Sequence, residues 1–506
     1  MPELDRFDVS SGAEVPESSE IEQPVETTVS SRIMAPDQSD DVGGGVDRIS
    51  GLPDDILRCI LVGLPSTADA ARTSVLSRRW RHVWAHLPEL ALRYGNRVDR
   101  LRAHELIDAA MGAYSAPTVR RLEIATPFGS RDVTAERASS WLRFASRRLA
   151  GRLKLSLPHP DLAPDKEGKI LLPVCERVTA IDMEYVGRAL RFQPLPAGGS
   201  AFAALATLRI TDARVDGREL EHVLSSRCPR LKEVVLEWVS FSLRDGDDDA
   251  AAVLSIRSGS LQRLQMASGR ELGGVLRVDT PELRVLTLRR ISCNDAYIAA
   301  PKLSELYWFP LFYVPSRHRF AEAGRHLRRM EVTTGSPSMA LMNRFNIVDE
   351  LKVTLSVPQG ARQYEKLLED TNRLSKCEVL VLKFEAVKHD LKPIMVHLLQ
   401  QCAGIRELVV EFPFKMGDYP CKLSRCPCKR LENTKTDRIV LHSLEEVRVK
   451  GGGEADHKAE LVRMLCECHA AFKKKVSFSV RGGAHTRGKI RSFVPPDDRY
   501  DITVWE

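Results

Sequence analysis

A glycine-rich stretch near the C-terminus has a spacing that could support chemistry. Gly483, Gly488 and Lys489 fit the start of the G-x-x-x-x-G-K pattern, in which backbone N–H groups and a lysine hold nucleotide phosphates. Ile490 stands where the pattern needs a Ser or Thr for magnesium, and the flanking strand and helix that the motif requires are not expected. We therefore predict a basic surface hairpin or loop and no nucleotide site.

Thiols and imidazoles in the same region could bind a metal ion, because zinc prefers thiolate and imidazole ligands. Their spacing does not repeat as paired C-x-x-C knuckles, so buried free thiols and oxidation-prone surface cysteines are the alternatives. We favour free thiols and predict no metal site and no cofactor. The candidate ligands are Cys421, Cys426, Cys428, His442, Cys466, Cys468 and His469.

Signatures of common enzyme classes are absent from the sequence. The thirteen histidines form no H-E-x-x-H motif, and neither a G-x-S-x-G elbow nor a dinucleotide-binding glycine fingerprint occurs. We therefore predict a chain that is not an enzyme and has no catalytic residues.

Composition and charge indicate an intracellular globular protein. Of 506 residues, 43% are hydrophobic and 28% are charged, which allows a sizeable core. No apolar run of 18 residues and no secretory signal occurs, and eleven cysteines, an odd number, fit a reducing compartment. We expect the nucleus or the cytoplasm and no membrane contact.

The charge is divided unevenly along the chain. Residues 1–46 hold eleven acids and two bases, a net of −9 within an overall +7, so the remainder carries +16. This segment is rich in Ser, Glu, Pro and Gly, and we predict a disordered acidic tail. The basic residues of the remainder are spread singly and are not interleaved with aromatics, so nucleic-acid binding is not expected.

Residues 47–92 predict three short helices. Pro53 starts an apolar stripe that Pro65 ends, Ser66 and Asp69 form a capping-box-like start, and Ser77 can cap a third helix. About 45 residues cannot bury all the Leu, Ile and Trp side chains in this segment. Its surface is therefore either an interaction site or a cap on the next domain.

This segment closely resembles the F-box of plant F-box/leucine-rich-repeat proteins. The resemblance lies in Leu52-Pro53-Asp54-Asp55-Ile56-Leu57, in Ile60-Leu61-x-x-Leu64-Pro65 and in Thr73–Arg81-x-x-Trp84. It implies docking on a Skp-type adaptor, carried by a cullin–RING ubiquitin ligase. Ala71 departs from the Val that many relatives carry, and we expect a modest loss of packing there. The implied adaptor contacts are Leu52, Pro53, Ile56, Leu57, Ile60, Leu61, Leu64, Pro65, Val75, Leu76, Ser77, Trp80 and Trp84.

Residues 93–420 contain a long internal repeat, whose final copy lies in the segment that follows. The template apolar-x-x-apolar-x-apolar recurs thirteen times, mostly at the 20–29-residue period of leucine-rich repeats. Because one strand and its return cannot bury an apolar face alone, the copies must stack into a curved solenoid with a parallel sheet, and the return segments are partly helical. The copies begin at Val119, Ala150, Val178, Leu205, Leu231, Leu261, Leu283, Leu303, Leu327, Val348, Cys377, Ile405 and Leu444.

Residues beside each buried pair point out of the sheet. Their mixed charges and two aromatics suit protein recognition, and a merely solvated sheet face is the alternative. The predicted substrate-binding residues are Arg209, Glu237, Arg289, Tyr307, Phe309, Arg329 and Lys352.

Residues 421–506 resemble the FBD module of plant F-box proteins and are predicted to cap the solenoid. The resemblance lies in the order of Cys426-Pro427-Cys428, Ser443–Val447, a glycine run and His457. We expect a helix at Ala455–Ala471 and a closing strand at Lys475–Val480. Gly451-Gly452-Gly453 replaces the module's usual aromatic-Gly.

The predicted fold is α/β: a three-helix F-box, a leucine-rich-repeat solenoid and an FBD-like cap. The resemblance implies a substrate-recognition subunit of an SCF-type (Skp–cullin–F-box) ubiquitin ligase, with an unknown protein as substrate. The alternative is a leucine-rich-repeat scaffold, outside any ligase, that binds a peptide, a small molecule or RNA.

Overall fold

The chain forms two units, Met1–Leu52 and Pro53–Glu506, and only the last two residues of the first unit are described. The predicted tail, residues 1–46, lies outside the described residues. The computed structural model describes residues 51–94, 102–127, 133–157, 168–194, 202–242, 253–267, 274–291, 293–309, 313–334, 337–357, 359–387, 389–402, 404–413, 425–429, 439–452, 455–468, 475–494 and 497–505.

Three short helices open the second unit, as predicted. They are α1 (Asp54–Val62), α2 (Thr67–Arg72) and α3 (Trp80–Val83), with 3-10 turns η1 (Thr73–Val75) and η2 (Trp84–His86). The Ser66 hydroxyl caps α2 by accepting from the Asp69 N–H at 3.2 Å. The expected cap at Ser77 is wrong, because Arg78 and Arg79 form a turn between it and the start of α3.

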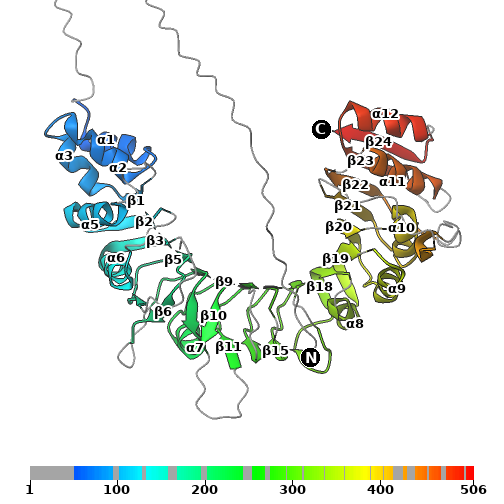
Figure 1. The fold of residues 1–506 in the computed structure, drawn as a ribbon, viewed down its shortest axis with the longest axis horizontal. Helices are drawn as coiled ribbons and strands as arrows, with labels where there is room; N and C mark the ends of the chain where they lie inside the picture. The colour runs from blue at the N-terminus through cyan, green and yellow to red at the C-terminus, as the bar shows by residue number, and fades with distance from the viewer. Residues whose placement is uncertain are drawn as a thin grey trace, which may run out of the picture. The chain divides into compact units, whose positions relative to one another are not determined.

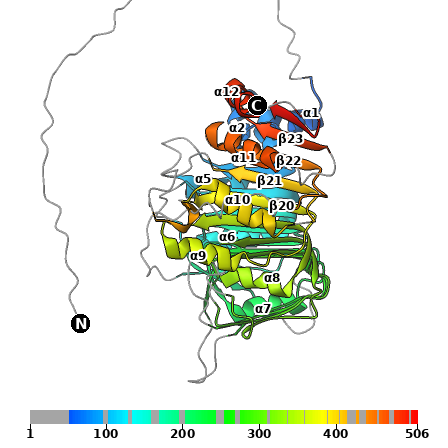
Figure 2. The ribbon, with the colours of Figure 1, turned by 90° about the vertical axis from the view of Figure 1, so that its right-hand side faces the viewer.

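Sixteen parallel strands form the main sheet of the described residues (Figures 1 and 2). All thirteen predicted repeat copies lie on its consecutive strands β2 to β22, which confirms the repeat. The strands are, in order, β1 (Glu89–Arg93), β2 (Val119–Ala125), β3 (Leu149–Ser156), β5 (Ala180–Glu184), β7 (Thr207–Thr211), β9 (Glu233–Glu237), β12 (Arg263–Ala267), β14 (Val285–Arg289), β16 (Glu305–Phe309), β18 (His326–Thr333), β19 (Ile347–Val357), β20 (Val379–Val387), β21 (Glu407–Phe412), β22 (Glu446–Gly451), β23 (Val476–Arg481) and β24 (Tyr500–Trp505).

Each strand buries alternate residues in one continuous core. Leu264 on β12 pairs with Leu286 on β14, which in turn pairs with Leu306 on β16, and all three side chains are fully buried. Period-2 alternation puts their chain neighbours on the opposite face of the sheet. Stacked repeats thus share the apolar contacts that a single strand could not make.

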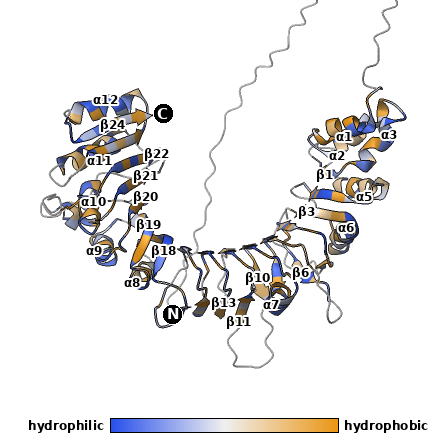
Figure 3. Cartoon of the chain, turned by 180° about the vertical axis from the view of Figure 1, so that it is seen from behind, coloured by the Kyte–Doolittle hydropathy of each residue, from blue (hydrophilic) through white to orange (hydrophobic). Residues whose placement is uncertain are grey.

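Helices cover one side of the main sheet (Figures 1 and 3). Figure 3 shows hydrophobic and hydrophilic residues on these helices, as expected of elements that bury one stripe. The helices expected at Gly217–Arg227, Gln363–Leu374 and Ala455–Ala471 are confirmed with shifted ends. The helices are α5 (Ala103–Ala113), α6 (Ala135–Arg148), α7 (Gly217–Ser226), α8 (Leu341–Arg344), α9 (Ala361–Asp370), α10 (Leu391–Gln400), α11 (Ala455–Glu467) and α12 (Ala484–Phe493), with 3-10 turns η3 (Pro337–Ala340) and η4 (Pro427–Lys429).

Strands replace helices on this side in the middle repeats. The copies that begin at Leu261, Leu283 and Leu303 are 22, 20 and 24 residues long, which leaves little room for a helix and two turns. Their return segments contain the strands β13 (Val275–Asp279), β15 (Asp295–Ala299) and β17 (His318–Ala321), which form a four-stranded parallel sheet with β11 (Val253–Arg257) of the preceding copy. A second four-stranded parallel sheet lies in longer copies; its strands are β4 (Lys169–Leu172), β6 (Ala189–Phe192), β8 (Arg214–Asp216), which α7 follows directly, and β10 (Ser240–Ser242).

The predicted boundary at residue 92 falls within continuous structure, whereas those at residues 46 and 420 lie outside the described residues. Residue 92 lies inside β1, which pairs with β2, and the strands of the predicted cap extend the same sheet. The expected closing strand is present as β23, but β24 follows it at the edge. In the part of the chain that the structure describes, no helix is long and apolar enough to cross a membrane.

Candidate functional site

Helix α1 divides its aliphatic residues between two faces. Leu57 and Leu61 are 0% and 2% exposed, whereas Ile56 and Ile60 are 46% and 47% exposed. Residues four apart lie on the same side of a helix. The helix therefore buries one aliphatic pair and presents the other to solvent.

The turn after α2 presents two more aliphatic side chains. Val75 and Leu76 are 87% and 65% exposed, among the most accessible large apolar residues described. Arg79, which follows this turn, donates to the Asp54 carboxylate at 2.7 Å and so holds the segment against the start of α1. We call the exposed set the helical apolar surface; it comprises Pro53, Ile56, Ile60, Val75 and Leu76.

Three of the predicted adaptor contacts do not reach the surface. Leu57, Leu61 and Trp80 are buried, and the continuous core of the sheet, which starts at Leu90, does not include them. Helix α1 contacts both α2 and α3, so we assign these three buried side chains to the packing of the helices and not to the core of the sheet. This burial corrects their predicted role: they support the surface and do not form it.

The other predicted contacts are partly accessible. Pro65 is exposed, whereas Leu52, Leu64, Ser77 and Trp84 are half-buried. Their accessible atoms extend the area available to a partner beyond the helical apolar surface.

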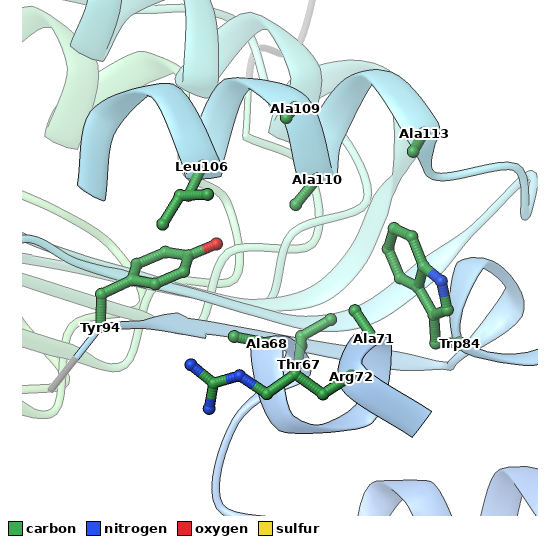
Figure 4. A pocket seen from close by; sticks show the side chains of 10 residues that line it. All are labelled: Thr67, Ala68, Ala71, Arg72, Trp84, Tyr94, Leu106, Ala109, Ala110 and Ala113. Atoms are coloured by element: carbon green, nitrogen blue, oxygen red, sulfur yellow. The ribbon is translucent and has the colours of Figure 1, made fainter. Parts of the chain in front are cut away.

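A cavity of about 450 Å³ separates α2 from α5. Figure 4 shows Leu106 and three alanines of α5 on one side, with Trp84, Tyr94 and residues of α2 opposite. Ala71, where a valine was expected, is one of the lining residues. Its small side chain leaves apolar space unfilled, in agreement with the expected loss of packing.

Filling this cavity is expected to stabilise the protein. Ala71→Val adds two methyl groups and should raise the free energy of unfolding by about 0.5–1 kcal/mol, after the lower helix propensity of valine is subtracted. Denaturation midpoints measure the effect. Ala484→Val, at an exposed helical alanine outside the cavity, serves as the control and should destabilise slightly. Equal changes in the two variants would contradict the assignment.

The polar face of the main sheet carries the predicted substrate-binding residues in rows. Glu237, Arg289 and Phe309 share one row across β9, β12, β14 and β16, and Arg289 lies over the Phe309 ring at 5.9 Å. Arg209 and Tyr307 belong to the adjacent row but are separated by three strands. The fold therefore brings together part of the predicted set.

Most of the predicted charges have partners on neighbouring strands. Arg209 pairs with Asp182 at 3.8 Å, Arg329 with Glu350 at 3.2 Å and Lys352 with Glu331 at 3.8 Å. Glu237 accepts from the Gln265 amide at 2.5 Å, and Tyr307 donates to Glu305 at 3.1 Å. Opposite charges across strands stabilise the sheet, so a partner would have to compete with these pairs.

Two carboxyl groups on this face have altered acidity. Burial raises the pKa of Asp182, and Glu184 raises it further, against the effect of Arg209. Burial also raises the pKa of Glu331, although Lys352 lowers it. Because these groups lie on β5 and β18, far apart in the strand order, they do not form an acid–base pair.

Two exposed aromatics on this side were not identified from the sequence. Tyr185 and Trp238 are each 50% exposed and have φ of 52° and 56°. They directly follow β5 and β9. A positive φ is unfavourable for bulky residues, and such strain is found at functional sites. A large aromatic directly after the strand of two copies, Tyr185 and Trp238, was the available signal.

The glycine-rich segment is helical, so the expected hairpin or loop is wrong. Strand β23 precedes it and α12 contains it, so the flanking elements are present after all. Gly488 and Lys489 lie in mid-helix, and Lys489 pairs with Asp456. No phosphate-cradling loop therefore forms between Gly483 and Lys489.

The predicted ligand residues do not gather as one set. Cys421 and His469 lie outside the described residues, and His442 is exposed. Cys426 and Cys428 are buried beside His389, which the sequence did not single out.

Comparison with known proteins identifies the N-terminal helices. The F-box domain model matches residues 49–91. An F-box protein of Arabidopsis thaliana is 41% identical over 113 residues, covering 22% of this chain and 34% of its own. From the same plant, a putative FBD-associated F-box protein is 27% identical over 254 residues, covering 48% and 55%. An F-box/FBD/LRR-repeat protein is 29% identical over 285 residues, covering 55% and 59%. The chain thus spans 34% to 59% of the length of these relatives.

Proposed function

We propose that this chain, which carries an F-box and leucine-rich repeats and is similar to F-box/FBD/LRR-repeat proteins of Arabidopsis thaliana, is the substrate-recognition subunit of an SCF-type ubiquitin ligase. The F-box would dock on a Skp-type adaptor and the repeats would hold the substrate. In this role the protein would act in the nucleus or the cytoplasm.

The exposure of the helical apolar surface carries the proposal. Ile56, Ile60, Val75 and Leu76 remain accessible although the neighbouring helices bury Leu57 and other apolar residues. A small module gains stability by covering such side chains, so their exposure favours a protein partner. The F-box match at residues 49–91 indicates a Skp-type adaptor as that partner.

Co-elution tests the docking step. The purified full chain and a purified Skp-type adaptor should elute together in gel filtration at micromolar concentrations. Separate elution of two folded proteins would contradict the proposal.

In this role the chain performs no transfer chemistry. A ubiquitin-conjugating enzyme bound to the RING subunit would transfer ubiquitin, and this chain would hold the substrate lysine close to the thioester. Such positioning accelerates a reaction by making it effectively intramolecular.

The substrate would bind at the carboxyl ends of the middle strands. Arg289 and Phe309 end β14 and β16, and Tyr185 and Trp238 follow β5 and β9. In a parallel sheet these ends lie at one edge. The edge thus offers aromatic and arginine side chains, which are enriched at the centres of protein interfaces.

Trp238→Asn is expected to weaken substrate capture at least tenfold. Asparagine accepts a positive φ, so the free energy of unfolding should change by less than about 1 kcal/mol. Quantitative mass spectrometry of proteins captured under proteasome inhibition should show a group that is lost with the variant. Tyr297→Asn, at a 39% exposed aromatic on β15 of a different sheet, is the control. Unchanged capture by Trp238→Asn would exclude this edge.

A further inference from the structure

Three buried side chains from two distant segments converge beside α10. His389, Cys426 and Cys428 are 0%, 3% and 1% exposed, and one ligand atom from each lies within 4.8 Å of the others. The Cys426 sulfur is 3.3 Å from His389 Nδ1. Two thiols and an imidazole in this arrangement are a typical donor set for a thiophilic metal.

The fold positions each ligand on a short connection. His389 lies between β20 and α10, and the two cysteines belong to residues 425–429, which include the 3-10 turn η4. That turn contacts α9 and α10. The cluster therefore joins a segment with little regular structure to the helical side of the sheet.

The spacing agrees with tetrahedral zinc coordination. Zinc–sulfur bonds of about 2.3 Å and zinc–nitrogen bonds of about 2.0 Å place sulfur and nitrogen about 3.5 Å apart, and two sulfurs about 3.8 Å apart. The observed sulfur–nitrogen separation of 3.3 Å and the 4.8 Å limit for the whole group are compatible with these values. We propose that His389, Cys426 and Cys428 bind a zinc ion that holds η4 against α9 and α10.

A buried phenol next to the cluster provides a second, independent indication. The Tyr364 ring lies 5.2 Å from the His389 ring, and its hydroxyl is buried without a hydrogen-bond partner among the described residues. A polar ligand held by an ion at this cluster would offer the phenol a partner, and so would remove the cost of leaving it unpaired.

The role of the zinc would be structural. The three residues lie beside the helices of the sheet and supply no path to an exposed surface, since all are buried. Three protein ligands leave one tetrahedral position for a water or a fourth side chain. Binding free energy would then contribute directly to the stability of residues 425–429.

The metal content of the purified full chain tests this site. Elemental analysis after gel filtration should find about one zinc per chain in the wild type. Cys426→Ser/Cys428→Ser should lose the zinc. The matched control is Cys466→Ser/Cys468→Ser, which removes a second buried C-x-C pair that forms no such cluster with a histidine in the described residues.

Cobalt substitution covers the case in which the double serine variant does not fold. Cobalt in the wild type should give a sulfur-to-metal charge-transfer band and the visible bands of a tetrahedral ion. His389→Cys should keep one metal and intensify the charge-transfer band, because sulfur replaces nitrogen. A folded wild type that binds neither metal, a disulfide between Cys426 and Cys428, or zinc retained by the double serine variant would each overturn the proposal.

Discussion

Ile56→Glu combined with Leu76→Glu is expected to weaken adaptor binding at least 100-fold. Fully burying a large aliphatic side chain contributes about 1.5–3 kcal/mol, and a partner can still cover the 46% and 65% of these side chains that are exposed. The loss of both contacts therefore amounts to about 2–3 kcal/mol, where about 1.4 kcal/mol corresponds to a factor of ten. Each carboxylate also carries a desolvation cost if it is enclosed by the partner. Isothermal titration of the full chain with a Skp-type adaptor measures the change.

The fold should survive this double substitution, because the two side chains are 46% and 65% exposed. Circular dichroism and thermal denaturation check this. Val253→Glu combined with Val314→Glu, at exposed valines of the repeats, adds the same charge elsewhere and should leave adaptor affinity unchanged. Equal affinities for the two double variants would contradict docking at the helical apolar surface.

Trp80→Ala is expected to unfold the N-terminal helices and to abolish docking indirectly. Trp80 is 5% exposed in a core that is separate from that of the sheet, and removing a buried tryptophan costs about 3–5 kcal/mol. A core of this size has little stability to spare. Hydrogen exchange should show faster exchange across residues 54–86, while the strands of the main sheet keep their protection.

Trp84→Ala is the matched comparison. Because Trp84 is only half-buried, its removal should lower the free energy of unfolding less than the removal of Trp80 does. The two mechanisms of lost docking are then distinguishable: the glutamate variant keeps protection of the helices, whereas Trp80→Ala loses it. Normal protection together with lost docking in Trp80→Ala would restore Trp80 as a direct contact.

The repeat was predictable because its signal is local and recurs. A triplet such as Leu264 and Met266 after Leu261 is weak alone, but thirteen copies at similar spacing require a stacked sheet, and each copy became a strand. The F-box segment was recognisable because its signal is also local: its prolines and tryptophans mark helix starts and the apolar stripe. The short strands of the return segments were not predicted, because residues such as Val275–Asp279 acquire their partners from other repeats.

The candidate site was only partly predictable. The sequence indicated a single apolar stripe between Pro53 and Pro65, and nothing local distinguished Ile56 from Leu57. Contacts with α2 and α3 bury the second and leave the first exposed. The charges on the sheet were predicted to face outward, but their pairing with neighbours such as Asp182 depends on the register between strands.

Residue spacing along the chain was thus enough to establish the three helices, the thirteen strand positions and the outward-facing side of the sheet. Contacts between segments far apart in sequence established which apolar residues remain exposed, which charges are paired, and that His389 lies beside Cys426 across 37 positions of chain. Periodicity is a property of neighbouring residues, whereas burial and juxtaposition arise only when the repeats stack.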